Sequence, residues 1–193
     1  MNDMQKVSLA SDTPVDPFKI LEKYYKKDSD LYALLVKHSQ DVMNKALDIA
    51  KKHPELNVDV AFVAEAAMLH DIGICLTYAP DIHCHGVMPY LCHGYLGREI
   101  LINEGLPVHA LVCERHTGIG MTADDIKEMS LPLPLRDMIP ESIEEELICF
   151  CDCFFSKTNL EHEKTVTEVR LELEKYTTEV GLKRFDDWCE RFL

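Results

Sequence analysis

The sequence predicts an all-helical protein, and three observations support that prediction. Apolar residues recur at i, i+3 and i+4 spacing through most of the chain, which is the period of a helix with one buried face. Capping residues or prolines precede these segments, and glycines or prolines follow them. No segment shows the convincing alternation of a strand, so we expect no sheet. A chain of 193 residues is long enough to bury one proper core.

The composition is that of a soluble globular protein, with 47% hydrophobic and 28% charged residues. The formal net charge of −14 disfavours binding to nucleic-acid polymers and to anionic membranes. A small anionic substrate remains compatible, because bound cations can dominate the charge of a site. No apolar run reaches the roughly 18 residues of a membrane span. Eight cysteines without a secretory signal indicate a reducing cytoplasm.

The N-terminal part of the chain predicts a leader followed by two helices. Residues 1–16 are expected to form a flexible leader, and residues 17–193 a single domain. Within that domain, residues 17–27 predict a short amphipathic helix, and a second helix runs from about 29 to 52 before His53-Pro54 ends it. His38 lies on the apolar stripe of this second helix, and therefore on the face that meets the core.

The central helix is expected over residues 58–71. It is apolar on every side apart from Glu65, which predicts a buried helix. It ends in His70-Asp71, and Gly73 is expected to stop it. Two polar side chains at the end of a buried helix need partners, because burying them unpaired costs on the order of several kcal/mol.

The remaining elements follow the same period. Residues 73–89 predict an irregular loop, and loops of that length in compact domains are more often functional than idle. Three prolines make the segment LPLPLRDMIP extended. Helices are expected over residues 89–104, 107–116, 122–129 and 142–156, with one or two closing helices over 160–193 that break near Gly181.

Five of the predicted helices direct an imidazole or a carboxylate inward. These candidate ligands are His38, His70, Asp71, His93, His116 and Asp152. Together they suit Fe, Mn, Ni or Zn better than Ca or Mg. Six ligands exceed the three or four that one catalytic ion takes from protein, which indicates two ions about 3.5–4 Å apart. Asp71, with ligands on both sides of it along the chain, is the natural bridge.

Structural roles are the alternative for each of these residues. A single inward histidine such as His93 or His116 is usually hydrogen-bonded within a core, and a buried His-Asp dipeptide can be a local pair. The coincidence across five helices favours metal binding. His53 and His109 do not fit the pattern and are expected to be solvated, and His162 to lie on the surface.

The order His38, His70-Asp71 within HDIG, then Asp152 resembles the H…HD…D pattern of the HD superfamily of metal-dependent phosphohydrolases. The resemblance covers about residues 30–160. His93 in CHGYLG and His116 in ERHTG resemble the two further histidines of members with a binuclear centre. The chain also resembles a small group of uncharacterised HDIG proteins of prokaryotes.

The resemblance implies an HD-domain bundle with a metal site between its core helices. His38, His70, Asp71 and Asp152 would hold the first ion. His93 and His116 would hold the second, with Asp71 bridging and central to catalysis. Fe or Mn is favoured, with Ni and Zn as alternatives.

The resemblance also raises the question of how phosphate is bound. Many relatives carry a lysine three residues after the HD dipeptide, where this chain has Ile74. Arg115, Lys157 and Arg98 are candidate substitutes, and Arg115 is preferred because a guanidinium matches phosphate with two hydrogen bonds. The alternative for each of these three residues is an ordinary ion pair or a position on the surface. His85, before Gly86, is a further candidate substrate contact.

The predicted function is hydrolysis of a phosphoester or phosphoanhydride of a small phosphorylated substrate, a nucleotide being favoured, by a metal-activated water. One alternative is a di-iron oxygenase on the same scaffold. The other is a nucleotide-binding sensor without catalysis. The sequence leaves the oligomeric state open, a homodimer included.

Overall fold

The structure is a computed structural model that describes residues 14–193. Its α-helices are α1 (Pro17–Tyr24), α2 (Asp30–Lys52), α3 (Val60–Leu69), α4 (His93–Asn103), α5 (Pro107–Arg115), α6 (Ala123–Glu128), α7 (Ile143–Asp152), α8 (Val166–Leu173) and α9 (Glu179–Phe192). Four 3-10 turns join them: η1 (Pro54–Leu56), η2 (Ile72–Leu76), η3 (Pro80–Ile82) and η4 (Tyr90–Cys92). The predicted all-helical class is confirmed.

The expectation that no strand forms is wrong. The short strands are β1 (Thr77–Ala79), β2 (Cys84–His85), β3 (Met88–Pro89), β4 (Phe155–Ser156) and β5 (Asn159–Glu163). β1 pairs antiparallel with β2 and parallel with β3, while β4 and β5 form an antiparallel hairpin. The segment over residues 73–89 is therefore made of short turns and strands. Strands of two to five residues are too short for their alternation to be recognised in a sequence.

The helices start where capping side chains were expected. Ser29 accepts a hydrogen bond from the Tyr32 N–H, and Ser142 accepts one from the Glu145 N–H. The closing region forms two helices, α8 and α9, and the break between them ends at Thr178, near Gly181 as predicted; Gly181 itself lies in the first turn of α9.

Residues 1–13 of the predicted leader lie outside the described residues. The rest of it makes contacts with the domain. The Val15 N–H donates to Glu65 Oε1 at 2.9 Å, and the side chain of Asp16 caps the start of α1.

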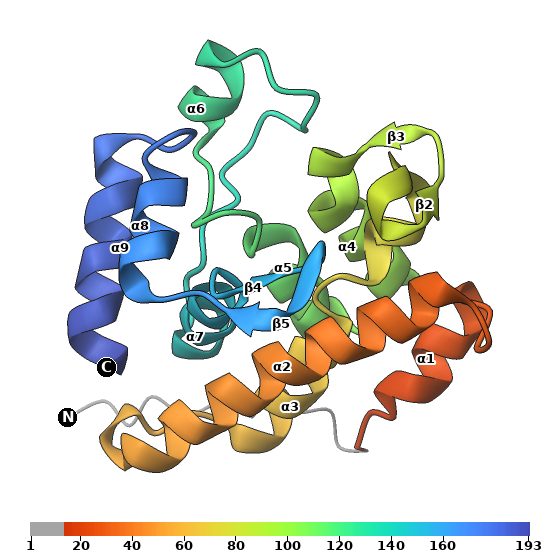
Figure 1. The fold of residues 1–193 in the computed structure, drawn as a ribbon, viewed down its shortest axis with the longest axis horizontal. Coiled ribbons are helices and arrows are strands. Elements are labelled where there is room, and N and C mark those ends of the chain that lie inside the picture. Colours follow the sequence, from red (N-terminus) through yellow and green to blue (C-terminus); the bar gives the residue numbers. More distant parts are fainter. Residues whose placement is uncertain (1–13) are drawn as a thin grey trace, which may run out of the picture.

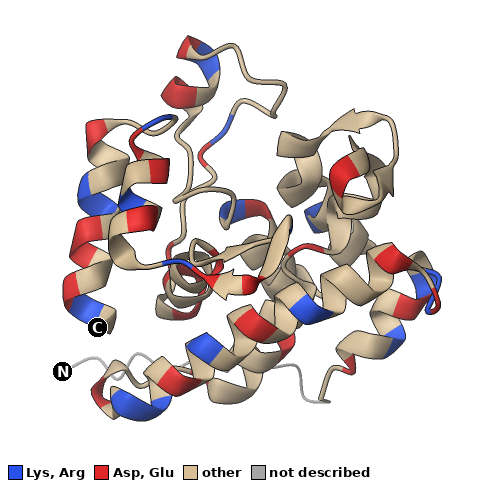
Figure 2. Cartoon of the chain, viewed as in Figure 1, with Lys and Arg blue, Asp and Glu red and all other residues tan. Residues whose placement is uncertain are grey.

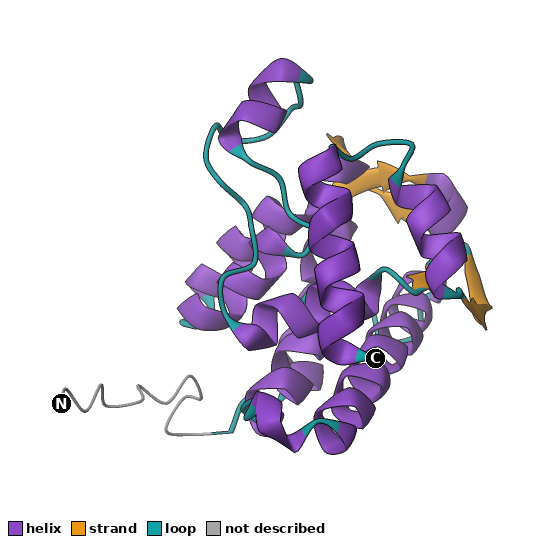
Figure 3. Cartoon of the chain, turned by 90° about the vertical axis from the view of Figure 1, so that its left-hand side faces the viewer, coloured by secondary structure: helices purple, strands orange, loops and turns teal. Residues whose placement is uncertain are grey.

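The helices α2, α3, α5 and α7 pack around the main core. Figure 1 shows α2 running across the molecule with α3 beside it, with α8 and α9 at one end and α4 with the β1–β3 segment at the other. Two extended connections carry α6 away from the body, as Figures 1 and 3 both show. Charged residues lie over the outer helices, whereas the segment around β2 and β3 is largely uncharged (Figure 2). In the described part of the chain, no helix is long and apolar enough to cross a membrane.

The end of α3 differs from the prediction in a way that matters for the site. The helix ends at Leu69, and Gly73 lies in η2 with a negative φ, so it is not a helix-stopping residue. A Cβ on Gly73 would collide with the backbone of His93 and Gly97, and one on Gly97 would collide with Cys113 Sγ. The two glycines allow η2 and α4 to approach closely, which places Asp71 beside His93.

Candidate metal centre

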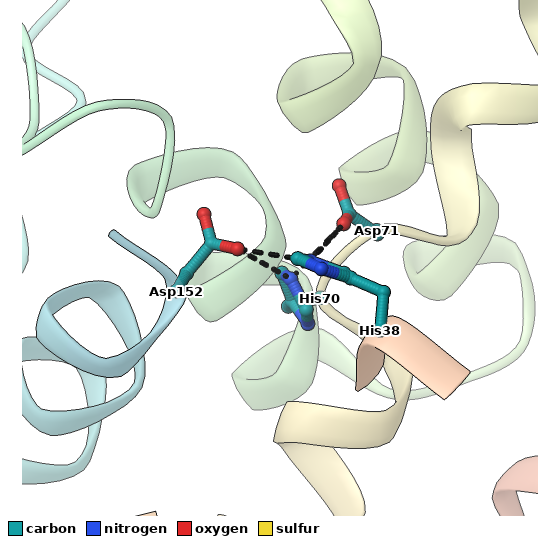
Figure 4. Close-up of side chains that lie close together, drawn as sticks. All are labelled: His38, His70, Asp71 and Asp152. Carbon is teal, nitrogen blue, oxygen red and sulfur yellow. Dashed lines mark ion pairs between the residues drawn. The ribbon is translucent and has the colours of Figure 1, made fainter. Parts of the chain in front are cut away.

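Three parts of the fold deliver the first group of candidate ligands, shown in Figure 4. His38 comes from the middle of α2, His70-Asp71 follows α3, and Asp152 ends α7. His38 Nε2 lies 3.1 Å from Asp71 Oδ2 and 2.9 Å from Asp152 Oδ1. His70 Nε2 lies 3.1 Å from Asp71 Oδ2 and 3.4 Å from Asp152 Oδ1. One ligand atom from each residue falls within 4.8 Å of all the others, as an ion requires.

The second group adjoins the first through Asp71. His93 Nε2 lies 3.4 Å and His116 Nε2 3.5 Å from Asp71 Oδ1, and the two ring nitrogens are 3.0 Å apart. One oxygen of Asp71 therefore faces His38 and His70, and the other faces His93 and His116. This is the arrangement of a bridging carboxylate, and the structure brings all six predicted ligands together.

Backbone carbonyls set the orientation of three of the histidines. The Nδ1 atoms of His70, His93 and His116 lie 2.6, 2.7 and 2.7 Å from the carbonyl oxygens of Ala67, Tyr90 and Cys113. A carbonyl can only accept, so Nδ1 carries the proton. In a neutral imidazole Nε2 is then free to bind a metal.

The hydrogen-bonding state of the cluster tests whether a metal fits. Six buried polar atoms here make no hydrogen bond of ordinary geometry: His38 Nδ1, His38 Nε2, His70 Nε2, Asp71 Oδ1, Asp71 Oδ2 and Asp152 Oδ1. Of these, Asp71 Oδ2 also forms an ion pair with Lys157. In addition, the Nε2 atoms of His93 and His116 face each other as two acceptors when both rings are neutral. Buried polar groups are normally hydrogen-bonded, so this concentration favours a bound cation. The nitrogen and carboxylate donors suit divalent transition metals.

The electrostatics of the cluster keep its carboxylates ionised, as metal binding also needs. Burial opposes ionisation of Asp71, yet Lys157 and His70 hold the pKa of its carboxyl well below the usual range. Burial likewise opposes ionisation of Asp152, but Lys157 and His38 lower its pKa. Burial lowers the pKa of His70 as well, but Asp71 and Asp152 outweigh it and raise that pKa to about 10, so without a metal His70 and Lys157 balance the two carboxylates. A metal ion bound to the same atoms would take over this role from His70.

Lys157 is the predicted phosphate-binding residue that reaches this centre. It lies in the turn between β4 and β5, and its Nζ is 2.6 Å from Asp71 Oδ2. Burial lowers the pKa of the Lys157 ammonium, but the attraction of Asp71 outweighs that effect and the pKa is raised. Lys157 is therefore a buried cation at the edge of the ligand cluster.

The other three predicted substrate contacts are placed elsewhere. Arg115 Nη1 lies 2.9 Å from Glu145 Oε2 and 3.2 Å from Glu141 Oε2. Arg98 pairs with Glu99 and Glu114. His85 is exposed on β2. None of the three lines the cavity beside the metal centre. Apart from the pair between the adjacent residues Arg98 and Glu99, these ion pairs join residues that are distant in sequence, so the local sequence did not reveal them.

A cavity of about 470 Å³ opens beside the ligand cluster. At its metal end it is lined by Tyr90, His93, His116, Asp152 and Lys157. Its other walls come from residues 117–121, from the connection that carries α6, and from α8 with the residues that follow it. Small-molecule sites commonly have volumes of about 300–1,000 Å³, so a nucleotide-sized compound fits.

The prediction that His109 is solvated is wrong. Its side chain is 2% exposed, its Nε2 lies 3.2 Å from Glu65 Oε2, and its ring meets the edge of Phe62. Glu65, the one charged residue of α3, could have indicated this pair, because a carboxylate on a buried helix needs a partner. The sequence also did not indicate Tyr90, which lines the cavity. His162 lies on the surface as predicted, and His53 is partly exposed.

More than half of the chain matches a known protein family. Residues 35–155 match the family model described as HD domain. The chain belongs to the HD-domain family. The match covers well over half of the chain and includes all six candidate ligands, so the resemblance inferred from the HDIG motif is confirmed at the level of the family.

Relatives of this HD-domain protein include longer chains. It is 32% identical to a tRNA (cytidine(56)-2′-O)-methyltransferase of Picrophilus torridus over 62% of its length, and 28% identical to that of Thermoplasma volcanium over 89%. It spans only 30% and 43% of those two proteins. It is also 34% identical to an uncharacterised protein of Methanocaldococcus jannaschii, over 61% of this chain and 64% of that protein.

A solved structure shares the fold. The HD domain of the Listeria monocytogenes phosphodiesterase PgpH, solved in complex with cyclic-di-AMP, superposes with a TM-score of 0.53. The alignment covers 91% of this chain and 95% of that domain, at 19% sequence identity. The HD-domain fold therefore extends over nearly the whole described chain.

Proposed function

We propose that this HD-domain protein is a phosphohydrolase that uses two divalent metal ions to cleave a phosphoester or phosphoanhydride bond of a small phosphorylated substrate. The observation that carries the proposal is the position of Asp71. Each of its carboxylate oxygens faces a separate pair of imidazoles, at 3.1 Å on one side and 3.4–3.5 Å on the other.

Ligand roles follow from the two groups. His38, His70, Asp71 and Asp152 would hold one ion, and His93 with His116 would hold the other, sharing Asp71. Bound there, divalent ions supply an acidified water and offset the negative charge of the phosphoryl oxygens. Fe or Mn suits this donor set, and Ni or Zn is also compatible with it.

The side chains of the cavity then bind and orient the substrate. We assign the phosphate contact to Lys157 in preference to Arg115, Arg98 and His85, because Lys157 lines the cavity and the two arginines are held by carboxylates. The cavity beyond Lys157 would hold the rest of the substrate. The PgpH domain was solved with cyclic-di-AMP on the same fold, which makes nucleotides the first compounds to test.

Hydrolysis of a panel of phosphate compounds tests this proposal. The purified protein is prepared without oxygen, loaded with Mn or Fe, and incubated with nucleotides, cyclic dinucleotides and other phosphate esters. Chromatography separates the products, because a cleaved diester gives a monoester and no inorganic phosphate. Elemental analysis establishes the number of ions in the same sample. We expect about two ions per chain and hydrolysis of at least one class of compound. A fully loaded protein that hydrolyses none of them would contradict the proposal, and oxygen uptake by the iron form would favour the oxygenase instead.

A further inference from the structure

Tyr90 forms part of the cavity wall beside the metal centre, and two contacts fix its position. Its ring stacks on that of His93, with centroids 4.8 Å apart and planes inclined by 24°. Its carbonyl oxygen accepts the hydrogen bond from His93 Nδ1 at 2.7 Å. Because the same residue contacts the His93 ring and orients it through the backbone, the Tyr90 hydroxyl is held in a defined place.

The Tyr90 side chain lies at the charged end of the cavity. Tyr90 lines the cavity together with Asp152 and Lys157. Burial raises the pKa of Tyr90, and the charges that act on this group are those of Lys157, Asp71 and Asp152. The phenol and the ammonium that we assign to phosphate binding therefore belong to the same end of the cavity.

The Tyr90 hydroxyl is available to a ligand. Within residues 14–193, no protein group accepts a hydrogen bond from it, and its side chain lines the cavity. Lys157, on the same cavity wall, has donors only, so it cannot accept this hydrogen bond. Two other tyrosines donate their hydroxyl hydrogens within the protein: the buried Tyr25 donates to the Ile72 carbonyl at 2.6 Å, and the exposed Tyr24 donates to Glu104 at 2.8 Å.

We infer that the Tyr90 hydroxyl donates a hydrogen bond to a phosphoryl oxygen of the bound substrate, beside Lys157. A phosphoryl group offers only acceptors, so it complements the two donors. Tyr90 is thereby a substrate-binding residue that touches the phosphoryl group, in addition to supporting His93. The catalytic meaning of this contact rests on the proposed hydrolase function, whereas the contact itself concerns phosphate binding.

The variant Tyr90→Phe separates the two contributions of the side chain. It keeps the ring that stacks on His93 and removes only the hydroxyl. Tyr95→Phe is the matched control, because it makes the same change on α4 at a residue outside the cavity lining. Metal content by elemental analysis shows whether either variant disturbs the centre.

The test uses the Mn-loaded chain of residues 1–193 and inorganic phosphate as the probe. Calorimetry measures the dissociation constant for phosphate, and kinetics on a substrate identified in the hydrolysis panel measure KM and kcat. We expect Tyr90→Phe to retain its metal, to bind phosphate at least about tenfold more weakly, and to raise KM by a similar factor, as for a lost hydrogen bond to a charged group. Tyr95→Phe should match the wild type.

Two results would overturn the inference. One is unchanged phosphate affinity and KM in Tyr90→Phe. The other is loss of metal from Tyr90→Phe, which would give the hydroxyl a purely structural role. If no compound is hydrolysed, the proposed function fails, but the phosphate-binding comparison still decides the role of Tyr90.

Discussion

Two buried clusters of histidine and carboxylate lie in the core of this protein, and they differ in how well they are satisfied. In the first, His109 Nε2 pairs with Glu65 Oε2 at 3.2 Å, and Glu65 Oε1 accepts the Val15 N–H at 2.9 Å. In the second, around Asp71, six buried polar atoms have no hydrogen-bond partner. Both clusters begin from α3, and both are nearly inaccessible to solvent.

The comparison shows which property indicates function. Burial of ionisable groups alone does not indicate function, because His109 is buried and Glu65 largely so, yet the two form a pair within the protein. A concentration of buried nitrogen and oxygen atoms without hydrogen bonds does indicate function. Such a cluster raises the free energy of the folded protein, and a bound cation would relieve that cost. Substitutions around Asp71 should therefore lower the metal content, whereas substitutions of Glu65 or His109 should affect the stability of the fold and leave the metal content unchanged.

The largest effect is expected from Asp71→Ala. It removes the carboxylate shared by both groups, so we expect the protein to lose most of its bound metal and its rate of hydrolysis to fall by several orders of magnitude. Elemental analysis measures the metal, and the hydrolysis assay measures the rate. Glu65→Ala, the equivalent change in the satisfied cluster, should keep both ions. An Asp71→Ala protein with full metal content would remove the distinction between the clusters.

A more selective loss is expected from His93→Ala. This change affects one side of Asp71 only, since His38, His70 and Asp152 remain in place. The metal content should fall from about two ions per chain to about one, with most activity lost. Retention of two ions would show that His93 is a core histidine and not a ligand.

Lys157→Met tests the assignment of the phosphate contact. We expect KM to rise by about tenfold to a hundredfold, as for loss of a charged hydrogen bond, with metal content maintained. Arg115→Met should leave KM unchanged and lower stability by about 1–3 kcal/mol, because Glu145 would lose its buried partner. A rise in KM in the Arg115 variant alone would restore the arginine to the role that the sequence suggested.

The smallest effect is expected from the pH dependence of the satisfied cluster. Burial lowers the pKa of His109 below its usual value near 6.5, although Glu65 acts in the opposite direction. The unfolded chain therefore binds the proton more readily, so the stabilising contribution is present above pH 6.5 and is lost as pH falls toward the folded-state pKa. Denaturant unfolding of metal-loaded protein between pH 7.5 and about 5.5 should show this loss, and a His109→Gln variant should show a smaller slope. Identical slopes would contradict the assignment.

The sequence could predict the parts of the molecule that depend on local pattern. The apolar stripe of α2 placed His38 toward the core, and the apolar body of α3 placed His70-Asp71 at a buried helix end. The strands β1–β5 could not be recognised because they are too short to show alternation. The partners of His109 and Arg115 could not be recognised either, because Glu65 and Glu145 lie 44 and 30 residues away along the chain. The preference for Arg115 over Lys157 followed from that limitation.

The contact between Gly73 and Gly97 has a consequence for how the centre opens. Asp71 precedes Gly73 by two residues and His93 precedes Gly97 by four, and the backbones meet where no side chain can rotate to take up a change. Asp71 and His93 can separate only if η2 and α4 separate, so their amide hydrogens should exchange with solvent in one cooperative opening. If two ions bind on either side of Asp71 as proposed, the backbone would set their spacing. Substitutions on the far walls of the cavity would then change which compounds bind without changing that spacing.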